Sequence, residues 1–185
     1  MDKKVRILAF GGSLRKGSYS RALMLEAQKL APANAEIEVF EINGIPMYNA
    51  DMEQSIPSAV RDFKAHIKAA DAVLIVTPEY NYSIPGFLKN AMDWASRPYP
   101  DNSFEDKPAA IISSSSGMLG GSRAQYHLRQ SMVYLDMHPI NKPECIVAGV
   151  AEKIKGGALT DEKTREVIRA LLKSLVDWTI RIGKK

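Results

Sequence analysis

Apolar stretches alternate with amphipathic stretches along this chain. The apolar ones predict strands at residues 5–10, 36–41, 72–77 and 108–113, followed by a fifth strand in two pieces at residues 138–140 and 144–147. The amphipathic ones predict helices at residues 20–30, 57–70, 87–96, 124–135 and 160–182. Strands joined by helices predict an α/β fold with a parallel sheet and right-handed crossovers.

Two of the predicted strands differ in pattern. Residues 36–41 alternate polar and apolar side chains, whereas residues 72–77 form a continuous apolar run. Because a strand covered on both faces is apolar throughout, we expect residues 72–77 at the centre of the sheet and residues 36–41 at an edge.

The unusual residues of the chain gather in three loops, which follow the first, third and fourth predicted strands. All three loops are therefore expected at the carboxyl edge of the sheet, where ligands of open α/β sheets bind. This clustering is the main reason to expect a binding site there.

The first loop reads G-G-S-L-R-K-G-S-Y-S from Gly11 and is suited to a phosphate. It leads into a helix N-terminus, where backbone N–H groups converge and the helix dipole is positive. Its side-chain donors are Ser13, Arg15, Ser18 and Ser20. The G-x-G-x-x-G spacing is absent, and Ser18 stands where a Walker A loop needs lysine. A single terminal phosphate such as that of FMN remains; the alternative is an ordinary loop with Ser18 as helix N-cap.

The second and third loops are suited to a flat ring. The second combines hydrogen-bonding groups with aromatic faces, in Pro78, Glu79, Tyr80, Asn81 and Tyr82. The third offers unobstructed backbone N–H groups, in Ser113, Ser114, Ser115, Ser116 and Gly117, and such donors stabilise negative charge on a ring. A proline-bounded turn with surface tyrosines and a flexible linker are the alternatives, but the two loops together favour a ring-binding pocket.

Composition narrows the function classes. We expect one domain over residues 1–185, with 45% hydrophobic residues to form its core. The net charge is +4, but the basic residues are scattered without the aromatic–basic pattern of nucleic-acid binding. A single cysteine, Cys145, and the lack of a signal peptide or membrane-length apolar run predict a cytoplasmic protein. His66, His127 and His138 lie far apart, so we expect no metal.

Three motifs occur in order over nearly the whole chain. They are G-G-S-L-R-K-G-S-Y-S, T-P-E-Y-N-Y-S-I-P-G-F-L-K-N-A-M-D-W and S-S-S-S-G-M-L-G-G-S-R-A-Q. With this spacing the chain resembles the NAD(P)H-dependent FMN reductase family, including bacterial quinone and chromate reductases. One departure is Ser20, where the family often has asparagine, although a serine also donates to a phosphate.

The resemblance implies a flavodoxin-like three-layer sandwich with a five-stranded parallel sheet in the order 2-1-3-4-5. It also implies non-covalent FMN, with its phosphate on the first loop and its isoalloxazine ring between the second and third loops. Family members are commonly dimers or tetramers. An arginine, a tyrosine and a glutamate that link subunits in the quinone reductase branch match Arg123, Tyr126 and Glu144 in spacing. An ordinary helix-face pair and a loop carboxylate are the equal alternative for these three.

The expected function is an oxidoreductase that passes hydride from NAD(P)H through FMN to a quinone, a flavin, chromate or an azo compound. No catalytic side chain is needed, because the flavin supplies the chemistry. Tyr82 and Arg97 are candidates to shape the acceptor site. The alternative is a flavodoxin-type electron carrier without NAD(P)H oxidase activity. The sequence leaves open the natural acceptor, the choice of NADH or NADPH, and the choice of dimer or tetramer.

Overall fold

The computed structural model describes residues 4–183, and its main parallel sheet has the predicted strand order. Across the sheet the strands are β2 (Ala35–Phe40), β1 (Val5–Gly11), β3 (Ala72–Pro78), β4 (Pro108–Ser114) and β5 (His138–Pro139). A further piece, β6 (Cys145–Val147), pairs with β4 beyond β5. The order 2-1-3-4-5 and the interruption of the last strand are therefore confirmed.

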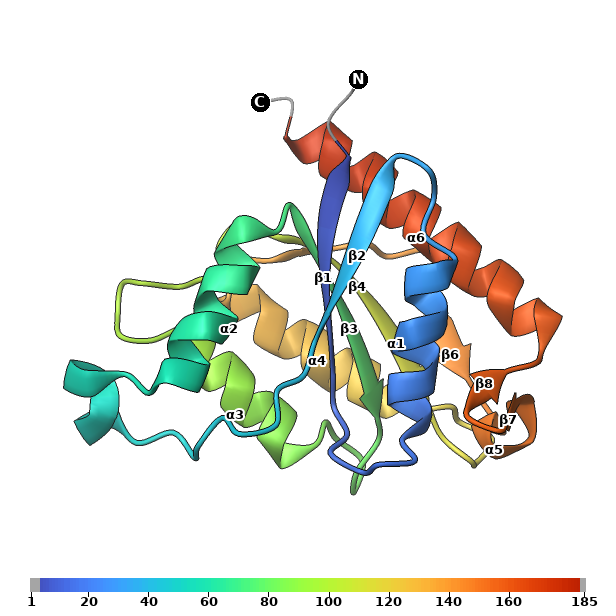
Figure 1. Cartoon of the computed structure of the whole chain (residues 1–185), viewed down its shortest axis with the longest axis horizontal. Helices are drawn as coiled ribbons and strands as arrows, with labels where there is room; N and C mark the ends of the chain where they lie inside the picture. Colours follow the sequence, from blue (N-terminus) through green and yellow to red (C-terminus); the bar gives the residue numbers. More distant parts are fainter. Residues whose placement is uncertain (1–3, 184–185) are drawn as a thin grey trace.

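Helices cover both faces of this sheet, which makes three layers (Figure 1). One face carries α1 (Tyr19–Lys29) and α6 (Glu162–Ile182); the other carries α2 (Ser58–Ala69), α3 (Gly86–Ala95) and α4 (Ser122–Tyr134). Successive side chains of a strand point to opposite faces. Ile7 and Ala9 of β1 accordingly pack with α1 and α6, while Leu8 and Phe10 pack with the other three helices.

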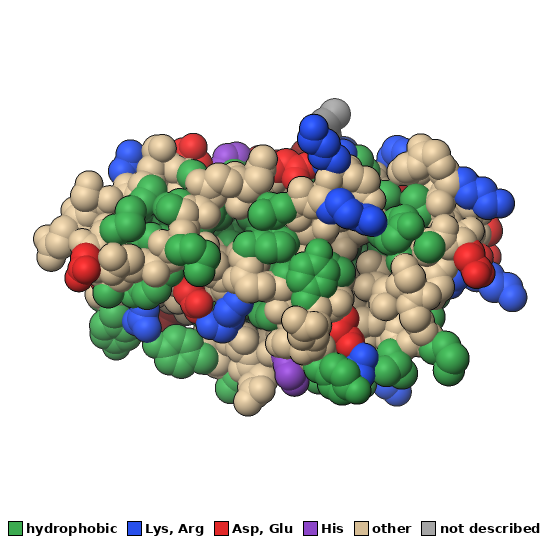
Figure 2. All heavy atoms as spheres, turned by 90° about the horizontal axis from the view of Figure 1, so that it is seen from below, with side chains coloured by type: hydrophobic (Ala, Val, Ile, Leu, Met, Phe, Trp, Pro, Cys, Tyr) green, Lys and Arg blue, Asp and Glu red, His purple; other side chains and the backbone are tan. Residues whose placement is uncertain are grey.

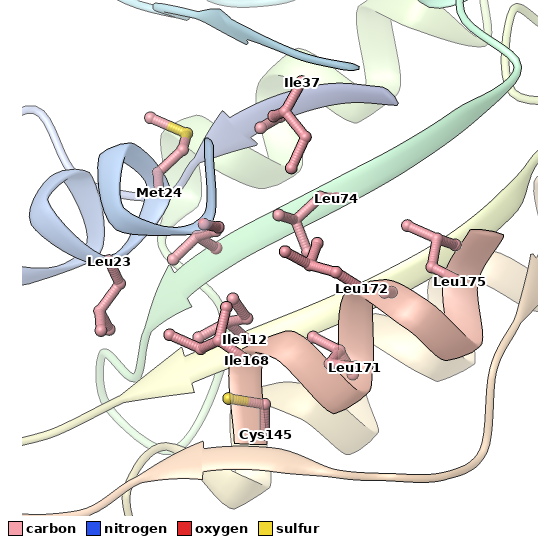
Figure 3. Packing of buried hydrophobic residues seen from close by; sticks show 14 of the residues in the cluster. Leu23, Met24, Ile37, Leu74, Ile112, Cys145, Ile168, Leu171, Leu172 and Leu175 are labelled. Atoms are coloured by element: carbon pink, nitrogen blue, oxygen red, sulfur yellow. The ribbon is translucent and has the colours of Figure 1, made fainter. Parts of the chain in front are cut away.

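The core between the sheet, α1 and α6 contains the single cysteine. Figure 3 shows Cys145 among Ile112, Ile168 and Leu171. It is 1% exposed, and burial raises the pKa of its thiol to about 12. The thiol therefore stays protonated at neutral pH and serves as a packing group.

Short elements and helix ends depart from the predictions. The structure adds a 3-10 helix (Ala50–Ser55), α5 (Val150–Lys153) and a hairpin of β7 (Ile154–Lys155) and β8 (Ala158–Leu159). Such segments are too short to show a hydrophobic period. Asp161 caps α6 by accepting a hydrogen bond from the Thr164 amide at 2.9 Å, so this helix begins at Glu162 instead of residue 160. Over the described residues, no helix is long and apolar enough to cross a membrane.

Candidate functional site

Three loops meet at the carboxyl edge of the sheet, the lower edge in Figure 1. Loop one (residues 12–18) follows β1, loop two (residues 79–85) follows β3, and loop three (residues 115–121) follows β4. They are neighbours because β3 pairs with both β1 and β4. Figure 2 views this side, where hydrophobic side chains and uncharged atoms cover most of the surface between scattered charges.

Loop one presents a row of backbone donors. Within residues 4–183, the amides of residues 13–17 donate no hydrogen bond. The first amides of α1 also lack a partner within the helix. Ser18 is the N-cap, because its Oγ accepts a hydrogen bond from the Arg21 amide at 3.2 Å. This cap uses a lone pair of the hydroxyl and leaves its proton free for an anion.

Gly12 determines how closely loop one passes over β3. Its amide donates to the Val76 carbonyl at 2.8 Å. A Cβ at this position would lie 2.7 Å from Thr77 Oγ1 and 3.2 Å from Leu88 Cδ2. Gly17 differs, because a Cβ there would have no atom within 4 Å. The loop is thus tightly packed at its start and open at its end.

The surroundings of loop one are positive. Arg15 and Lys16 are exposed and form no ion pair with another described residue, and the Arg15 guanidinium lies 4.9 Å from the ring centroid of Tyr19. The first turn of α1 holds no acidic residue. A hollow of about 240 Å³ lies between the end of loop one with α1 and the β7–β8 hairpin, lined by Lys16, Ser18, Arg21 and Ile154 among others. An anion at loop one meets free amides, a helix N-terminus and two cations.

The other two serines that are predicted to bind the phosphate differ in solvent exposure. Ser13 is half-buried within loop one, whereas Ser20 lies in the first turn of α1 and is 2% exposed. The structure thus brings Ser13, Arg15 and Ser18 to one loop and places Ser20 just behind it.

Loop two contains a tight turn. The backbones of Tyr80 and Ser83 exchange two hydrogen bonds of 2.9 Å each. Between them, Asn81 and Tyr82 have φ values of 48° and 69°. Both lie in the left-handed region, which asparagine tolerates better than a bulky aromatic residue. The turn leaves the Tyr80 and Tyr82 side chains largely exposed.

Helix α4 contacts loop two at three side chains. Arg123 forms an ion pair with Glu79, and its guanidinium lies 3.6 Å from the ring centroid of Tyr82. One helical turn later, His127 Nδ1 lies 2.9 Å from Ser83 Oγ. The hydrogen bond to Glu79 raises the pKa of the Arg123 guanidinium above its ordinary value. Nothing in the local sequence of either segment indicates these contacts.

Loop three starts later than the serine run predicts. Ser113 and Ser114 are the last residues of β4 and are buried. The Ser113 hydroxyl donates to the Gly120 carbonyl at 2.9 Å and accepts from Gln125 Nε2 at 3.0 Å. These two serines therefore shape the loop, while Ser115, Ser116 and Gly117 form its more accessible surface. The expected row of free amides is shorter than predicted, because the Ser115 amide donates to the Val147 carbonyl and the Gly117 amide to Ser115 Oγ, both at 3.1 Å.

Arg97 does not join the three loops. It follows the C-terminal end of α3, and a ten-residue helix separates it from loop two by about 15 Å. There it lines a hollow together with Tyr48 and Tyr134.

The three residues predicted at a subunit interface do not lie together within one chain. Tyr126 OH donates to Glu144 Oε1 at 3.3 Å, whereas Arg123 faces loop two.

The residues at this edge fit FMN. Free amides and a cation suit a phosphate at loop one, and the aromatic and glycine-rich surfaces of loops two and three suit a flat ring. For a metal ion, residues 4–183 contain no group of three or more histidine, cysteine, aspartate or glutamate side chains placed to hold one.

Comparison with known proteins agrees with this geometry. Residues 5–152 match the family model described as NADPH-dependent FMN reductase. The chain belongs to this family. The relationship predicted from the three motifs is confirmed, and the matched region includes all three loops.

Individual relatives match over nearly their full lengths. The NAD(P)H-dependent FMN reductase of Pseudomonas aeruginosa is 48% identical over 184 residues, covering 98% of this chain and 99% of that protein. The quinone reductase of Escherichia coli K12 is 41% identical over 187 residues, with 98% and 99% coverage. Among solved structures, the flavoenzyme NAD(P)H:(acceptor) oxidoreductase FerB from Paracoccus denitrificans superposes with a TM-score of 0.88 at 39% identity, covering 96% of this chain and 98% of FerB.

Proposed function

We propose that this chain binds FMN non-covalently and passes hydride from NAD(P)H to a quinone or a similar small acceptor. One observation carries the proposal: the five consecutive amides of residues 13–17, which donate no hydrogen bond within the described residues, lead into the start of α1 beside loops two and three. Relatives that match nearly the whole chain are an FMN reductase and a quinone reductase, which supports the same activity.

In this proposal loop one binds the phosphate. The amides of residues 13–17, the hydroxyls of Ser13 and Ser18 and the guanidinium of Arg15 donate to its oxygens, and Ser20 contributes its helical amide. The charge of Arg15 is available to the phosphate, because its side chain is exposed and forms no ion pair with another described residue.

Loops two and three hold the ring. Residues 78–82 flank one edge, with the Tyr82 ring fixed by Arg123. The Ser116 amide is the proposed donor to the other edge, because the Ser115 and Gly117 amides already donate to the Val147 carbonyl and to Ser115 Oγ. When bound, FMN supplies the hydride chemistry by accepting hydride from NAD(P)H and donating it to the acceptor. The protein orients the reactants and provides donors where negative charge develops.

The acceptor site is proposed beside Tyr82, whose side chain is 67% exposed at the turn of loop two. An open site of this kind admits a quinone, a flavin, chromate or an azo compound. Arg97 lies at the far end of α3, so its predicted role in this site requires a contact that a single chain does not make.

We propose a homodimer or homotetramer as the functional form. Helix α4 exposes Tyr126, Val133 and Tyr134 by 55%, 81% and 70%, and apolar side chains clustered on one helix favour burial against a second copy. Tyr126 and Glu144, already hydrogen-bonded to each other, are the proposed contact residues. Light scattering after gel filtration measures the state directly. The proposed location remains the cytoplasm.

The central test is spectroscopic and kinetic. The purified protein, loaded with FMN, is mixed with NADPH or NADH in the absence and presence of a quinone. Loss of the oxidised flavin absorbance on adding nucleotide, and its return on adding quinone, supports the proposal. A protein that binds FMN but is not reduced by either nucleotide is an electron carrier, and a protein that binds no FMN refutes the assignment.

A further inference from the structure

The turn of loop two holds one residue, Tyr82, in a backbone conformation that its side chain does not favour. Asn81 and Tyr82 have φ values of 48° and 69°, and Tyr82 is a bulky residue in the left-handed region. Residues in such conformations persist only where the surrounding structure holds them. The two hydrogen bonds between Tyr80 and Ser83 close the turn but do not tie it to the rest of the molecule.

The contacts that hold this turn to the rest of the molecule come from α4. Arg123 pairs with Glu79 before the turn and stacks on Tyr82 inside it, and His127 hydrogen-bonds Ser83 after it. Arg123 and His127 are four residues apart, so they lie on the same face of the helix. The helix itself is anchored to the core by buried Leu128 and Met132. A rigid element therefore contacts loop two on both sides of the strained residue Tyr82.

We propose that Arg123 and His127 are positioning residues that hold loop two in its FMN-binding shape. This inference rests on the proposed function. It gives Arg123 a task inside one chain, whereas the family resemblance gives it a link between subunits. If only a fraction of molecules carries the competent loop, the apparent affinity for the ligand falls by that fraction. Loosening the loop therefore weakens FMN binding without removing any atom that contacts FMN.

The Arg123–Glu79 pair is poorly designed for stability alone. The Glu79 side chain is 7% exposed, and the buried atoms Glu79 Oε2 and Arg123 Nε have no hydrogen-bond partner among the described residues. Buried ion pairs with unsatisfied atoms contribute little net stability, because desolvation offsets their attraction. Fixing the geometry of a loop is a role that such a pair can fill.

The test compares FMN affinity with the stability of the apoprotein. Arg123→Lys keeps the charge but loses the planar stack on Tyr82. Arg123→Met combined with Glu79→Gln removes both charges, so no unpaired carboxylate remains buried to destabilise the fold. Because Glu79 itself belongs to the proposed ring site, Glu79→Gln alone is the reference against which the FMN affinity of the double variant is compared. His127→Ala removes the third tie. Arg129→Met is the matched control, because Arg129 lies on the same helix but donates to the Ile140 carbonyl.

We expect Arg123→Lys and the double variant to raise the Kd for FMN about tenfold and His127→Ala about threefold. Flavin fluorescence quenching measures the Kd. Hydrogen exchange at the Tyr80 and Ser83 amides of the apoprotein should become faster in all three. The melting temperature of the double variant should stay near that of the unaltered protein, and Arg129→Met should leave the Kd and the exchange unchanged.

FMN affinity within twofold of the unaltered protein in both Arg123 variants would overturn the inference. It would also fail if loop-two exchange stayed slow, or if Arg129→Met weakened FMN binding equally. An unaltered protein that binds no FMN refutes the proposed function instead, and the exchange measurement still reports whether α4 holds the loop.

Discussion

Helices α1 and α6 begin in opposite electrostatic surroundings. The N-terminus of α6 supplies its own negative groups: Asp161 caps it, accepting from the Thr164 amide and hydroxyl at 2.9 and 2.6 Å, and Glu162 lies in the first turn. The N-terminus of α1 has a neutral cap, Ser18, and no acidic residue in its first turn. It is preceded instead by Arg15 and Lys16.

The difference separates a structural helix start from one that is prepared for a ligand. Both N-termini carry the same partial positive charge, which favours a nearby anion. At α6 the chain provides that anion. At α1 the chain adds further positive charge, so this N-terminus favours an anion from outside the chain, in accord with the proposed phosphate of FMN.

The largest effect is expected when the N-terminus of α1 receives a carboxylate, as the N-terminus of α6 has. Gly17→Asp places one at an open position, where a Cβ meets no atom within 4 Å. We expect the Kd for FMN to rise about 100-fold, because the carboxylate occupies the amides and repels the phosphate. Gly17→Asn has nearly the same shape without the charge and should show a much smaller effect. Equal effects of the two variants would mean that shape, not charge, controls binding.

A second substitution tests the tight packing beneath loop one. Gly12→Ala drives a Cβ to 2.7 Å from Thr77 Oγ1 and should lower the free energy of unfolding by about 1–3 kcal/mol. Urea denaturation of the apoprotein measures the change. Gly17→Ala, at the open end of the same loop, is the control and should change stability by less than about 0.5 kcal/mol. Similar losses in both would show that the loop is uniformly packed.

Removing the cation of loop one tests its contribution alone. Arg15→Met should raise the Kd for FMN about tenfold at low salt, and the effect should shrink as ionic strength rises. The stability of the apoprotein should not change, because Arg15 is exposed. Lys163→Met, an exposed substitution on α6, controls for the loss of one positive charge. A salt-independent effect would argue against a direct charge contact.

The smallest effect is expected at α6. Asp161→Ala should lower stability by about 1 kcal/mol at pH 7 without affecting FMN binding, whereas Asp161→Asn retains a capping oxygen and should cost less. Hydrogen bonds from Thr164 lower the pKa of Asp161 below its ordinary 3.8. Its charge therefore stabilises the fold above about pH 4 and ceases to do so as the pH falls through the folded-state pKa. Denaturation at pH 7 and pH 3 should show the difference between variant and unaltered protein shrinking in acid.

The sequence predicted the sheet and the three loops because both follow from local patterns. A continuous apolar run such as residues 72–77 predicts a central strand, and the carboxyl ends of parallel strands meet at one edge. The interruption of the last strand is also predictable, because two short apolar pieces lie on either side of Pro143. Strand and helix ends shifted by one or two residues, since caps such as Asp161 depend on geometry.

The ties on loop two could not be predicted in this way. Glu79 and Arg123 are brought together by the packing of α4 on the sheet, and nothing in the local pattern of either residue specifies the other. The same holds for Ser113. It belongs to a run of serines that suggests ligand binding, but its hydroxyl donates to the Gly120 carbonyl within the chain. The position of Arg97 relative to the loops depends on the length of α3, which places it at the far end of that helix within one chain, so its role at the acceptor site stays a prediction.

The burial of Cys145 has a consequence if the proposed acceptor is a quinone. Quinones are electrophiles that add to thiolates and leave them arylated. The chain's single cysteine is 1% exposed, and its thiol, with a pKa of about 12, offers almost no thiolate at neutral pH. Under the proposed function, the protein can thus turn over many equivalents of a quinone without arylation of its cysteine.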